Sequence, residues 1–207
     1  MALARRQSAP AIEAYRKAHQ LEPNSATLIK LFRAMSTQDD QTPALRLAEQ
    51  WIKKYAGDVS VHKVLADGYA RAGNFPAARA AYEAALKLFP TDAESLNNLA
   101  NVQLRLKDPA AVKTAETALK HAPGNAVVID TLGWALFQNG QSERALQVLR
   151  DARLRQPGNQ EIRFHLASVL AQTGRQAEAK EELRAALADP TRFDTRADSE
   201  RLLHSLP

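Results

Sequence analysis

The side chains of this sequence best suited to acid–base or metal chemistry are five histidines: His19, His62, His121, His165 and His204. No two of them have the i, i+4 spacing that places a pair of metal ligands on one face of a helix. The sequence contains no glycine-rich phosphate loop, and no serine lies in a nucleophile elbow. A lone histidine on a helix is more often structural or solvated than catalytic. We therefore expect no enzyme activity, no cofactor and no metal site.

Basic residues outnumber acidic residues, with 28 Lys and Arg against 23 Asp and Glu. The net charge is +3 over residues 1–58, +2 over residues 59–125 and zero over residues 126–207. Most basic side chains alternate with acidic ones, as on an ordinary solvated helix surface. Nucleic-acid binding by counterion release needs several cations on one face. The charge pattern therefore predicts no nucleic-acid partner.

The composition indicates packed helices, since the 45% of hydrophobic residues are mostly Ala and Leu and only 8 residues are Gly. The longest apolar run is far shorter than the ~20 residues of a membrane-spanning helix. We therefore expect no direct membrane insertion by this segment. The chain has no cysteine, so it can form neither disulfides nor thiolate metal sites. Cysteine usage leaves both a cytoplasmic and a periplasmic location open.

The elements that must position these side chains recur with a period of 34 residues. The period is marked by prolines that each follow an apolar helical segment, and Ala56 fills the same position once. Consecutive positions are 33 or 34 residues apart, and Asn or Asp follows most of them, which suits the cap of a next helix. The marking prolines are Pro23, Pro90, Pro123, Pro157 and Pro190. A period of this length indicates an array of repeats.

Residues 126–159 show the structure expected of one repeat. Apolar residues, among them Ile129 and Leu132, recur at helical spacing up to Gly140 and again after it. The pattern predicts two amphipathic helices joined by a tight turn at Gly140, because glycine readily adopts the left-handed conformation that ends a helix. We expect Gly133 to let the second helix approach closely, and Pro157 to end that helix.

These positions resemble the consensus of the tetratricopeptide repeat (TPR) family. Residues 59–92 match it most fully, with Leu65, Ala66, Tyr69, Gly73, Phe75, Ala78, Tyr82, Ala85 and Pro90 in the expected order. The resemblance implies an all-α fold, a right-handed α-solenoid of TPR helical hairpins. The predicted boundaries are a half repeat at 1–24, a degenerate repeat at 25–58, repeats at 59–92, 93–125, 126–159 and 160–193, and a capping helix at 194–207.

Two parts of this array depart from the regular pattern. Repeat 93–125 is one residue short and turns through Lys107, Asp108 and Pro109 instead of through glycine. The chain also begins within a repeat, because residues 1–24 supply only a second helix. Such an end would expose apolar surface, so we expect Met1 to begin a piece of a longer array, or a partner or self-association to cover this end.

The resemblance also implies a place for ligands. In the TPR family the first helix of each hairpin lines a concave groove, and ligands usually lie there. The change along the groove from charged through amide to aromatic side chains suits an extended peptide or a partner helix with one polar and one apolar end. The register places in this groove Lys63, Asp67, Arg71, Asn97, Asn98, Asn101, Arg105, Asp130, Trp134, Phe137 and Phe164.

Trp134 is the groove residue best suited to anchor a partner, because Trp is common among interface anchors. The alternative is that Trp134 packs on the neighbouring hairpin, since Trp is usually largely buried. The asparagines and the basic side chains are likewise open to a second interpretation, as an ordinary solvated helix face.

A subset of the family grips the C-terminal carboxylate of chaperone peptides. Lys63 and Asn98 match two positions of that clamp. Asp67 stands where the clamp has an Asn, and Val127 and Thr131 replace its final basic pair. The sequence therefore does not favour a chaperone-tail receptor.

The leading functional hypothesis is a scaffold that binds a protein or peptide in the groove, and the alternative is a structural spacer or self-assembling array that uses exposed hairpin faces. The segments Ile129–Ala135 and Glu161–Ala167 and the Arg-rich stretch before Leu202 also resemble the C-terminal part of bacterial TPR lipoproteins encoded with PEP-CTERM protein-sorting and exopolysaccharide systems. That resemblance implies an envelope assembly and a periplasmic, outer-membrane-tethered location.

Overall fold

The computed structural model describes residues 2–191 and 193–207, so Met1 of the predicted half repeat and Arg192 of the last predicted repeat lie outside the described residues. The described residues form twelve α-helices and no strand, which confirms the predicted all-α fold. No helix in this described part is both long and apolar enough to span a bilayer. The chain divides into two compact units, unit 1 (Met1–Leu106) and unit 2 (Lys107–Pro207), and each is described by itself below.

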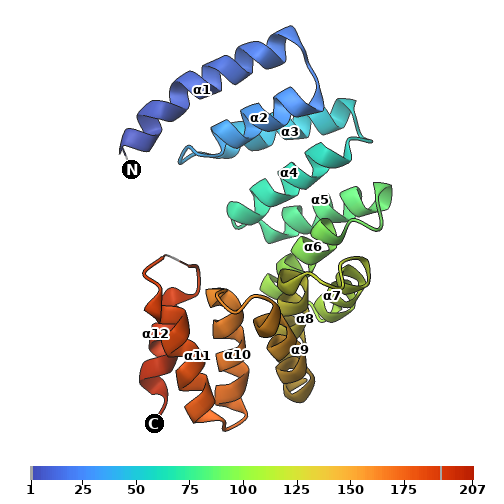
Figure 1. The fold of residues 1–207 in the computed structure, drawn as a ribbon. Coiled ribbons are helices and arrows are strands. Elements are labelled where there is room, and N and C mark those ends of the chain that lie inside the picture. The colour runs from blue at the N-terminus through green and yellow to red at the C-terminus, as the bar shows by residue number, and fades with distance from the viewer. Residues whose placement is uncertain (1, 192) are drawn as a thin grey trace. The chain divides into compact units, whose positions relative to one another are not determined.

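In unit 1 each helix packs against the helix that follows it in sequence, as hairpins require. Helix α2 also contacts α4, and α4 contacts α6, so these alternate helices share one face of the unit (Figure 1). The helices are α1 (Ala2–Leu21), α2 (Ser25–Met35), α3 (Thr42–Lys54), α4 (Val59–Arg71), α5 (Phe75–Leu88) and α6 (Ala93–Arg105).

Unit 2 has the same arrangement. Each helix contacts its successor, and α8 contacts α10 across the intervening α9. The last helix packs on α11, at the place where the sequence predicts a cap. The helices are α7 (Ala110–His121), α8 (Ala126–Gln138), α9 (Ser142–Arg155), α10 (Gln160–Gln172), α11 (Gln176–Ala188) and α12 (Arg196–Ser205).

The Asn and Asp residues that follow the marking positions act as helix caps. Asn24 accepts a hydrogen bond from the backbone N–H of Thr27, and Asp58 accepts one from Val61. Asp92, Asn125 and Asn159 do the same at the starts of α6, α8 and α10. Each cap satisfies one of the backbone donors that have no partner within the helix. The sequence thus determines where the first helices of the hairpins begin.

Four of the hairpin turns contain a left-handed residue, and the α2–α3 turn does not. Gly73, Gly140 and Gly174 have φ of 75°, 75° and 79°. The residue after each glycine donates its N–H back to Tyr69, Leu136 or Leu170, which closes the Schellman hydrogen-bond pattern. In the short repeat, Lys107 takes this place with φ of 56°, the only described residue other than glycine with positive φ. The division between the two units falls beside Lys107.

Glycine also permits the close approach of two helices in unit 2. A Cβ added to Gly133 of α8 would lie 2.5 Å from Cγ of Leu149 on α9. Leu149 is fully buried. The predicted role of Gly133 is therefore confirmed.

In unit 1, Gly68 of α4 likewise permits close packing. Here an added Cβ would lie 2.7 Å from Cζ of Phe32 and 2.9 Å from Cδ2 of Leu45. Phe32 stands where the consensus has a small residue, and the missing side chain at Gly68 makes room for its ring. The degenerate repeat 25–58 can therefore pack on its neighbour.

Candidate functional site

The predicted groove residues of unit 1 lie on α4 and α6, and we call this surface the polar face. Lys63 on α4 is bound at the start of α6: its Nζ lies 2.9 Å from Oδ2 of Asp92 and 2.6 Å from Oε2 of Glu94. Burial alone would lower the pKa of Lys63, but the hydrogen bonds to Glu94 and Asp92 outweigh burial and raise it. Lys63 therefore ties α4 to α6 in this structure.

Asp67 is the centre of a hydrogen-bond network on the polar face. Its carboxylate accepts a hydrogen bond from the Tyr82 hydroxyl and, at 3.4 Å, one from Nδ2 of Asn98. Burial, followed by the contact with Asp67, raises the pKa of Tyr82. Asn97 donates to Asn98 at 3.4 Å and is 6% exposed, and its Oδ1 has no partner among the described residues. These bonds orient the amides, although 3.4 Å is long for a hydrogen bond.

The exposed part of the polar face is formed by Arg71, Asn101 and Arg105. The Arg105 guanidinium lies over the Phe75 ring, 5.2 Å from its centroid. Asn98, Asn101 and Arg105 line a shallow pocket of about 200 Å³ that also includes Phe75. The structure thus brings three predicted site residues together around a small hollow with an apolar wall.

In unit 2 three of the predicted residues, Trp134, Phe137 and Phe164, gather with His165 as an aromatic cluster on α8 and α10. The Trp134 and His165 rings stack, with centroids 4.2 Å apart and planes 17° apart. The ring centroids of Phe137 and Phe164 lie 5.3 Å and 6.2 Å from that of Trp134, and both rings are tilted against it. Offset and tilted contacts of this kind are favourable between aromatic rings.

Asp130 fixes this cluster from α8. Its carboxylate oxygens lie 2.9 Å and 3.0 Å from Nδ1 of His165. The Asp130 and His165 side chains are 10% and 15% exposed, so the imidazole is held between the carboxylate and the Trp134 ring. Phe164 is buried as well, while Trp134 and Phe137 keep intermediate exposure. A partner would therefore meet Trp134 and Phe137.

The geometry is compatible with both interpretations of Trp134, as a partner anchor and as a residue that packs on the neighbouring hairpin. The ring packs on the neighbouring hairpin, since His165 and Phe164 belong to α10, but it is not fully covered. The contact of His165 with Asp130 was not predicted from the sequence. The available signal was the separation of 35 residues, one repeat plus one position. No group of three or more His, Cys, Asp or Glu side chains in the described chain could hold a metal ion.

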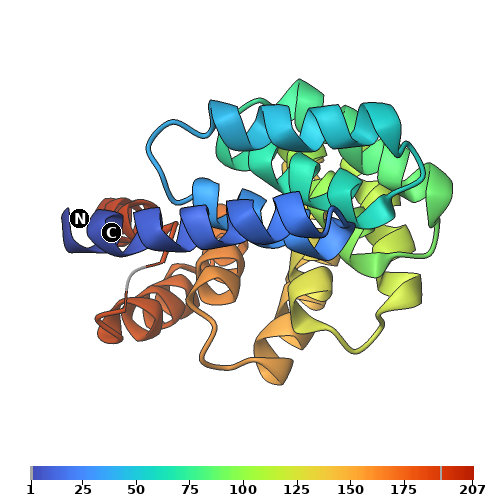
Figure 2. The ribbon, with the colours of Figure 1, turned by 90° about the horizontal axis from the view of Figure 1, so that it is seen from above.

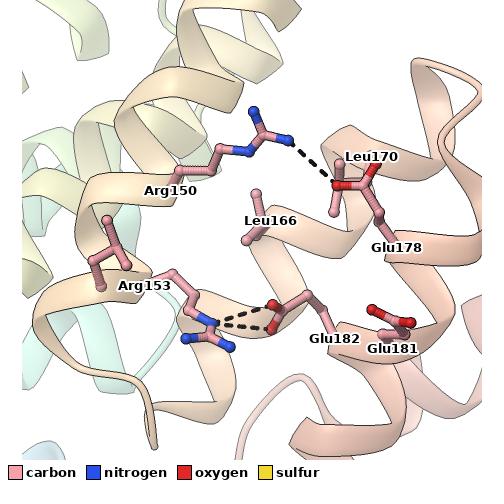
Figure 3. A pocket seen from close by; sticks show the side chains of 8 residues that line it. Arg150, Arg153, Leu166, Leu170, Glu178, Glu181 and Glu182 are labelled. Carbon is pink, nitrogen blue, oxygen red and sulfur yellow. Dashed lines mark hydrogen bonds and ion pairs between the residues drawn. The ribbon is translucent and has the colours of Figure 1, made fainter.

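A hollow in unit 2 lies between α9 and α11, over α10, and we call it the unit 2 outer crevice. Its volume is about 240 Å³. Figure 3 shows Leu166 between two ion pairs that run from α9 to α11. The Arg150–Glu178 pair is 3.3 Å long and the Arg153–Glu182 pair is 3.1 Å long. The sequence did not point to this crevice, because the predicted residues were all on first helices.

The fold defines a class of proteins, the arrays of helical hairpins. A sequence profile described as the tetratricopeptide repeat matches residues 64–126 and 131–194, more than half of the chain. The chain belongs to the tetratricopeptide repeat family.

Solved structures of similar fold support this assignment. MamA, residues 41 to the end, from Desulfovibrio magneticus RS-1 is 21% identical, with a TM-score of 0.67 over 78% of this chain and 94% of that chain. YrrB, described as a TPR protein with an unusual peptide-binding site, is 18% identical, with a TM-score of 0.68 over 94% and 98%. The thermophilic TPR protein TTC0263 from Thermus thermophilus is 19% identical, with a TM-score of 0.67 over 95% and 99%. At these identities the likeness shows the fold.

Proposed function

We propose that this protein is a non-catalytic scaffold that binds a peptide or a partner helix on its first-helix faces. The observation that carries the proposal is the aromatic cluster of unit 2. Trp134 and Phe137 keep exposed ring surface, and large aromatic side chains contribute most of the binding energy in many interfaces.

The surroundings of Trp134 favour binding because they limit its motion. The His165 ring stacks on it, and Asp130 holds His165 through Nδ1. A side chain that is already ordered loses less conformational entropy when a partner covers it. The tetratricopeptide repeat fold also carries a peptide-binding site in YrrB, which supports peptide binding as the activity.

The polar face of unit 1 supplies a complementary chemistry. Arg71, Asn101 and Arg105 are exposed and can donate hydrogen bonds to backbone carbonyls or carboxylates of a partner. Each surface suits a different part of a partner, the polar face a polar part and the aromatic cluster an apolar part. The partner class we propose is therefore a mixed apolar and polar protein segment.

The test compares the wild-type chain with the double variant Trp134→Ala, Asn101→Ala as bait in affinity purification from the native organism. We expect the variant to recover much less of any protein that the wild type retains, while its far-UV circular dichroism stays unchanged. The matched control is Tyr15→Ala with Gln147→Ala, which removes an exposed aromatic ring and an exposed amide elsewhere. Equal recovery by both double variants would refute the proposal.

We further propose that the assembly served is a bacterial envelope system for exopolysaccharide or protein sorting. The support is the sequence resemblance of the Ile129–Ala135 and Glu161–Ala167 segments. Cell fractionation with an antibody to the native protein tests this, with recovery in the envelope fraction expected. Recovery in the cytosol alone would contradict it.

A self-assembling array is the competing function, and two exposed leucines favour it. Leu21 and Leu154 are 78% and 75% exposed. Sedimentation velocity over a concentration series separates the two functions: a scaffold that awaits a partner stays monomeric, whereas an array sediments faster as concentration rises.

A further inference from the structure

A crevice in unit 1 lies between α1 and α3, with α2 as its floor, and we call it the unit 1 outer crevice. Two adjoining pockets of about 430 Å³ and 200 Å³ form it, and both are lined by His19, Leu47 and Gln50. Helices α1 and α3 both pack against α2, and the ribbons of these three helices can be followed in Figures 1 and 2. None of the residues proposed above for partner binding lines these pockets.

One position on the first helices differs between α4 and the helices that floor the two outer crevices. Met35, Tyr69 and Leu170 each lie ten residues after the first residue of α2, α4 and α10. Tyr69 donates its hydroxyl hydrogen bond to Glu49 on α3, so its ring occupies the space between α4 and the preceding helix. Met35 and Leu170 have no ring, and each lines an outer crevice. Both outer crevices thus have a side chain without a ring at the position that Tyr69 holds on α4.

The charges that line the two outer crevices differ. Glu178 and Glu182 in the unit 2 outer crevice bind its own Arg150 and Arg153. The unit 1 outer crevice is lined by Arg16, Arg46 and Lys54, and no carboxylate lines either of its pockets.

Two of the basic residues that line the unit 1 outer crevice have an acidic neighbour outside it. Arg16 pairs with Glu13, which is itself exposed, and Asp40 lies within electrostatic range of Arg46. His19 accepts or donates a hydrogen bond at 2.9 Å to the Thr27 hydroxyl, and burial lowers the pKa of its ring, so the imidazole is neutral at pH 7. The permanent charges lining the crevice are therefore all positive.

The floor and one wall of the same crevice are apolar. Leu31 and Met35 of α2 and Leu47 of α3 line the larger pocket, and Trp51 lines the smaller one. An apolar cavity of about 150 Å³ is large enough to bind benzene. The larger pocket, at about 430 Å³, therefore has room for more than one leucine or phenylalanine side chain.

We propose that the unit 1 outer crevice binds an acidic amphipathic peptide segment of a partner protein. The apolar side chains of the segment fill the space above Leu31 and Met35, and its carboxylates lie against Arg16, Arg46 and Lys54. The complementary charge selects an acidic segment, and the aliphatic floor selects a peptide over a nucleic-acid backbone, which has no side chains to cover it. This site is separate from the first-helix faces and does not rest on the function proposed for them.

The experiment measures fluorescence anisotropy of three labelled twelve-residue peptides that share one helical pattern of leucines. Their polar positions carry only Glu, only Lys or only Gln. The full chain is expected to bind the Glu peptide more tightly than the Lys and Gln peptides. Binding of the Glu peptide should weaken as salt rises from about 50 to about 300 mM, because salt shortens the Debye length and screens the charges. Equal binding of all three peptides would overturn the proposal.

Two substitutions locate the binding. Met35→Tyr places in α2 the side chain that α4 carries naturally and should abolish binding by filling the crevice. Arg46→Glu, at an exposed position, should weaken binding by roughly tenfold, as expected from about 1.4 kcal/mol for the lost and reversed charge. Circular dichroism melting curves verify that both variants fold.

The matched controls are Leu170→Tyr, which fills the unit 2 outer crevice, and Arg184→Glu, which reverses an exposed charge on α11. Both should bind the Glu peptide like the wild type, as should Trp134→Ala, so that failure of this site and failure of the first-helix faces can be told apart. Loss of binding in Leu170→Tyr but not in Met35→Tyr would overturn the proposal. Displacement of the peptide by a single-stranded oligonucleotide of equal charge at lower concentration would do so as well.

Discussion

The first-helix faces of the two units are built on the same backbone repeat but hold their side chains by different interactions. In unit 1, Asp92 and Glu94 bind Lys63, and Asp67 accepts hydrogen bonds from Tyr82 and Asn98. In unit 2, Trp134 stacks on His165 and contacts Phe137 in a tilted orientation, and these contacts bury apolar surface. Burial of apolar area stabilises a fold more than exchange of water for protein hydrogen bonds does. The face of unit 2 should therefore contribute more to the stability of its own unit than the face of unit 1.

Each unit carries one tryptophan, Trp51 in unit 1 and Trp134 in unit 2. Trp134→Phe leaves Trp51 as a reporter of unit 1, and Trp51→Phe leaves Trp134 as a reporter of unit 2. Urea unfolding of these two backgrounds, followed by tryptophan emission, measures the free energy of unfolding reported from each unit. The stability predictions below are stated for these backgrounds.

The largest expected difference is between Phe164→Ala and Asn97→Leu. Phe164 is 9% exposed in the aromatic cluster, and truncating a buried phenylalanine lowers the free energy of unfolding by about 3–5 kcal/mol. Asn97→Leu removes a buried amide whose Oδ1 has no described partner, so the change should stay within about 1 kcal/mol. Similar losses for the two variants would show that the two faces contribute equally.

The second comparison concerns the close helix contacts. Gly133→Ala should lower the free energy of unfolding of unit 2 by about 1–2 kcal/mol, because the Cβ meets the branch point of Leu149 on α9. Gly68→Ala should change unit 1 by less than about 1 kcal/mol, because the atoms in its way are the ends of the Phe32 and Leu45 side chains, and Ala favours the helix over Gly. If Gly68→Ala is the more damaging variant, the contact in unit 1 is the less adaptable one.

The sequence determined the features that depend on local chemistry. Caps such as Asp92, the turn at Gly140 and the close approach at Gly133 follow from residue type and spacing, and all are observed. The positions of Trp134 and Phe164 on first helices follow from the period. Their identity as partner-binding residues stays a prediction.

Features that depend on how neighbouring helices are rotated and spaced could not be predicted in this way. The contact of His165 with Asp130 joins residues in successive repeats, and its geometry depends on the packing of α8 against α10. The binding of Lys63 by Glu94 depends on the direction of two flexible side chains. The outer crevices depend on the combined volumes of side chains from three helices, which no single repeat contains.

The third prediction tests the junction between the units at Lys107. This lysine has φ of 56°, a conformation that costs an L-residue about 1–2 kcal/mol. Glycine avoids this cost, but its greater freedom in the unfolded chain cancels part of the gain in stability. Lys107→Gly should therefore raise the free energy of unfolding of unit 2 by about 0.5–1 kcal/mol. Gly140→Lys, at φ of 75°, is the matched reverse change and should lower it. If both changes leave the stability unaltered, the turns adapt to a lysine without strain.

The smallest expected effect tests the polar face through pH. Burial alone would raise the pKa of Asp92, but hydrogen bonds from Ser95 and Lys63 outweigh it and hold the pKa below the ordinary value of 3.8. A carboxylate with a depressed pKa stabilises the fold fully above its ordinary pKa, and this contribution is lost as pH falls through the folded-state value. The ion pair of Asp92 with Lys63 should therefore stabilise unit 1 at neutral pH and cease to do so in strong acid.

Asp92→Asn isolates this contribution, because it keeps a residue that can cap α6 and removes mainly the charge. At pH 7 we expect it to lower the free energy of unfolding of unit 1 by about 0.5–1 kcal/mol. This deficit should shrink toward zero as the pH falls below 3.8 and through the lower pKa of the folded state. Glu94→Gln, whose side chain is 69% exposed, is the control and should have a smaller effect at pH 7. A deficit for Asp92→Asn that persists unchanged in strong acid would mean that lost packing or capping, and not the ion pair with Lys63, accounts for it.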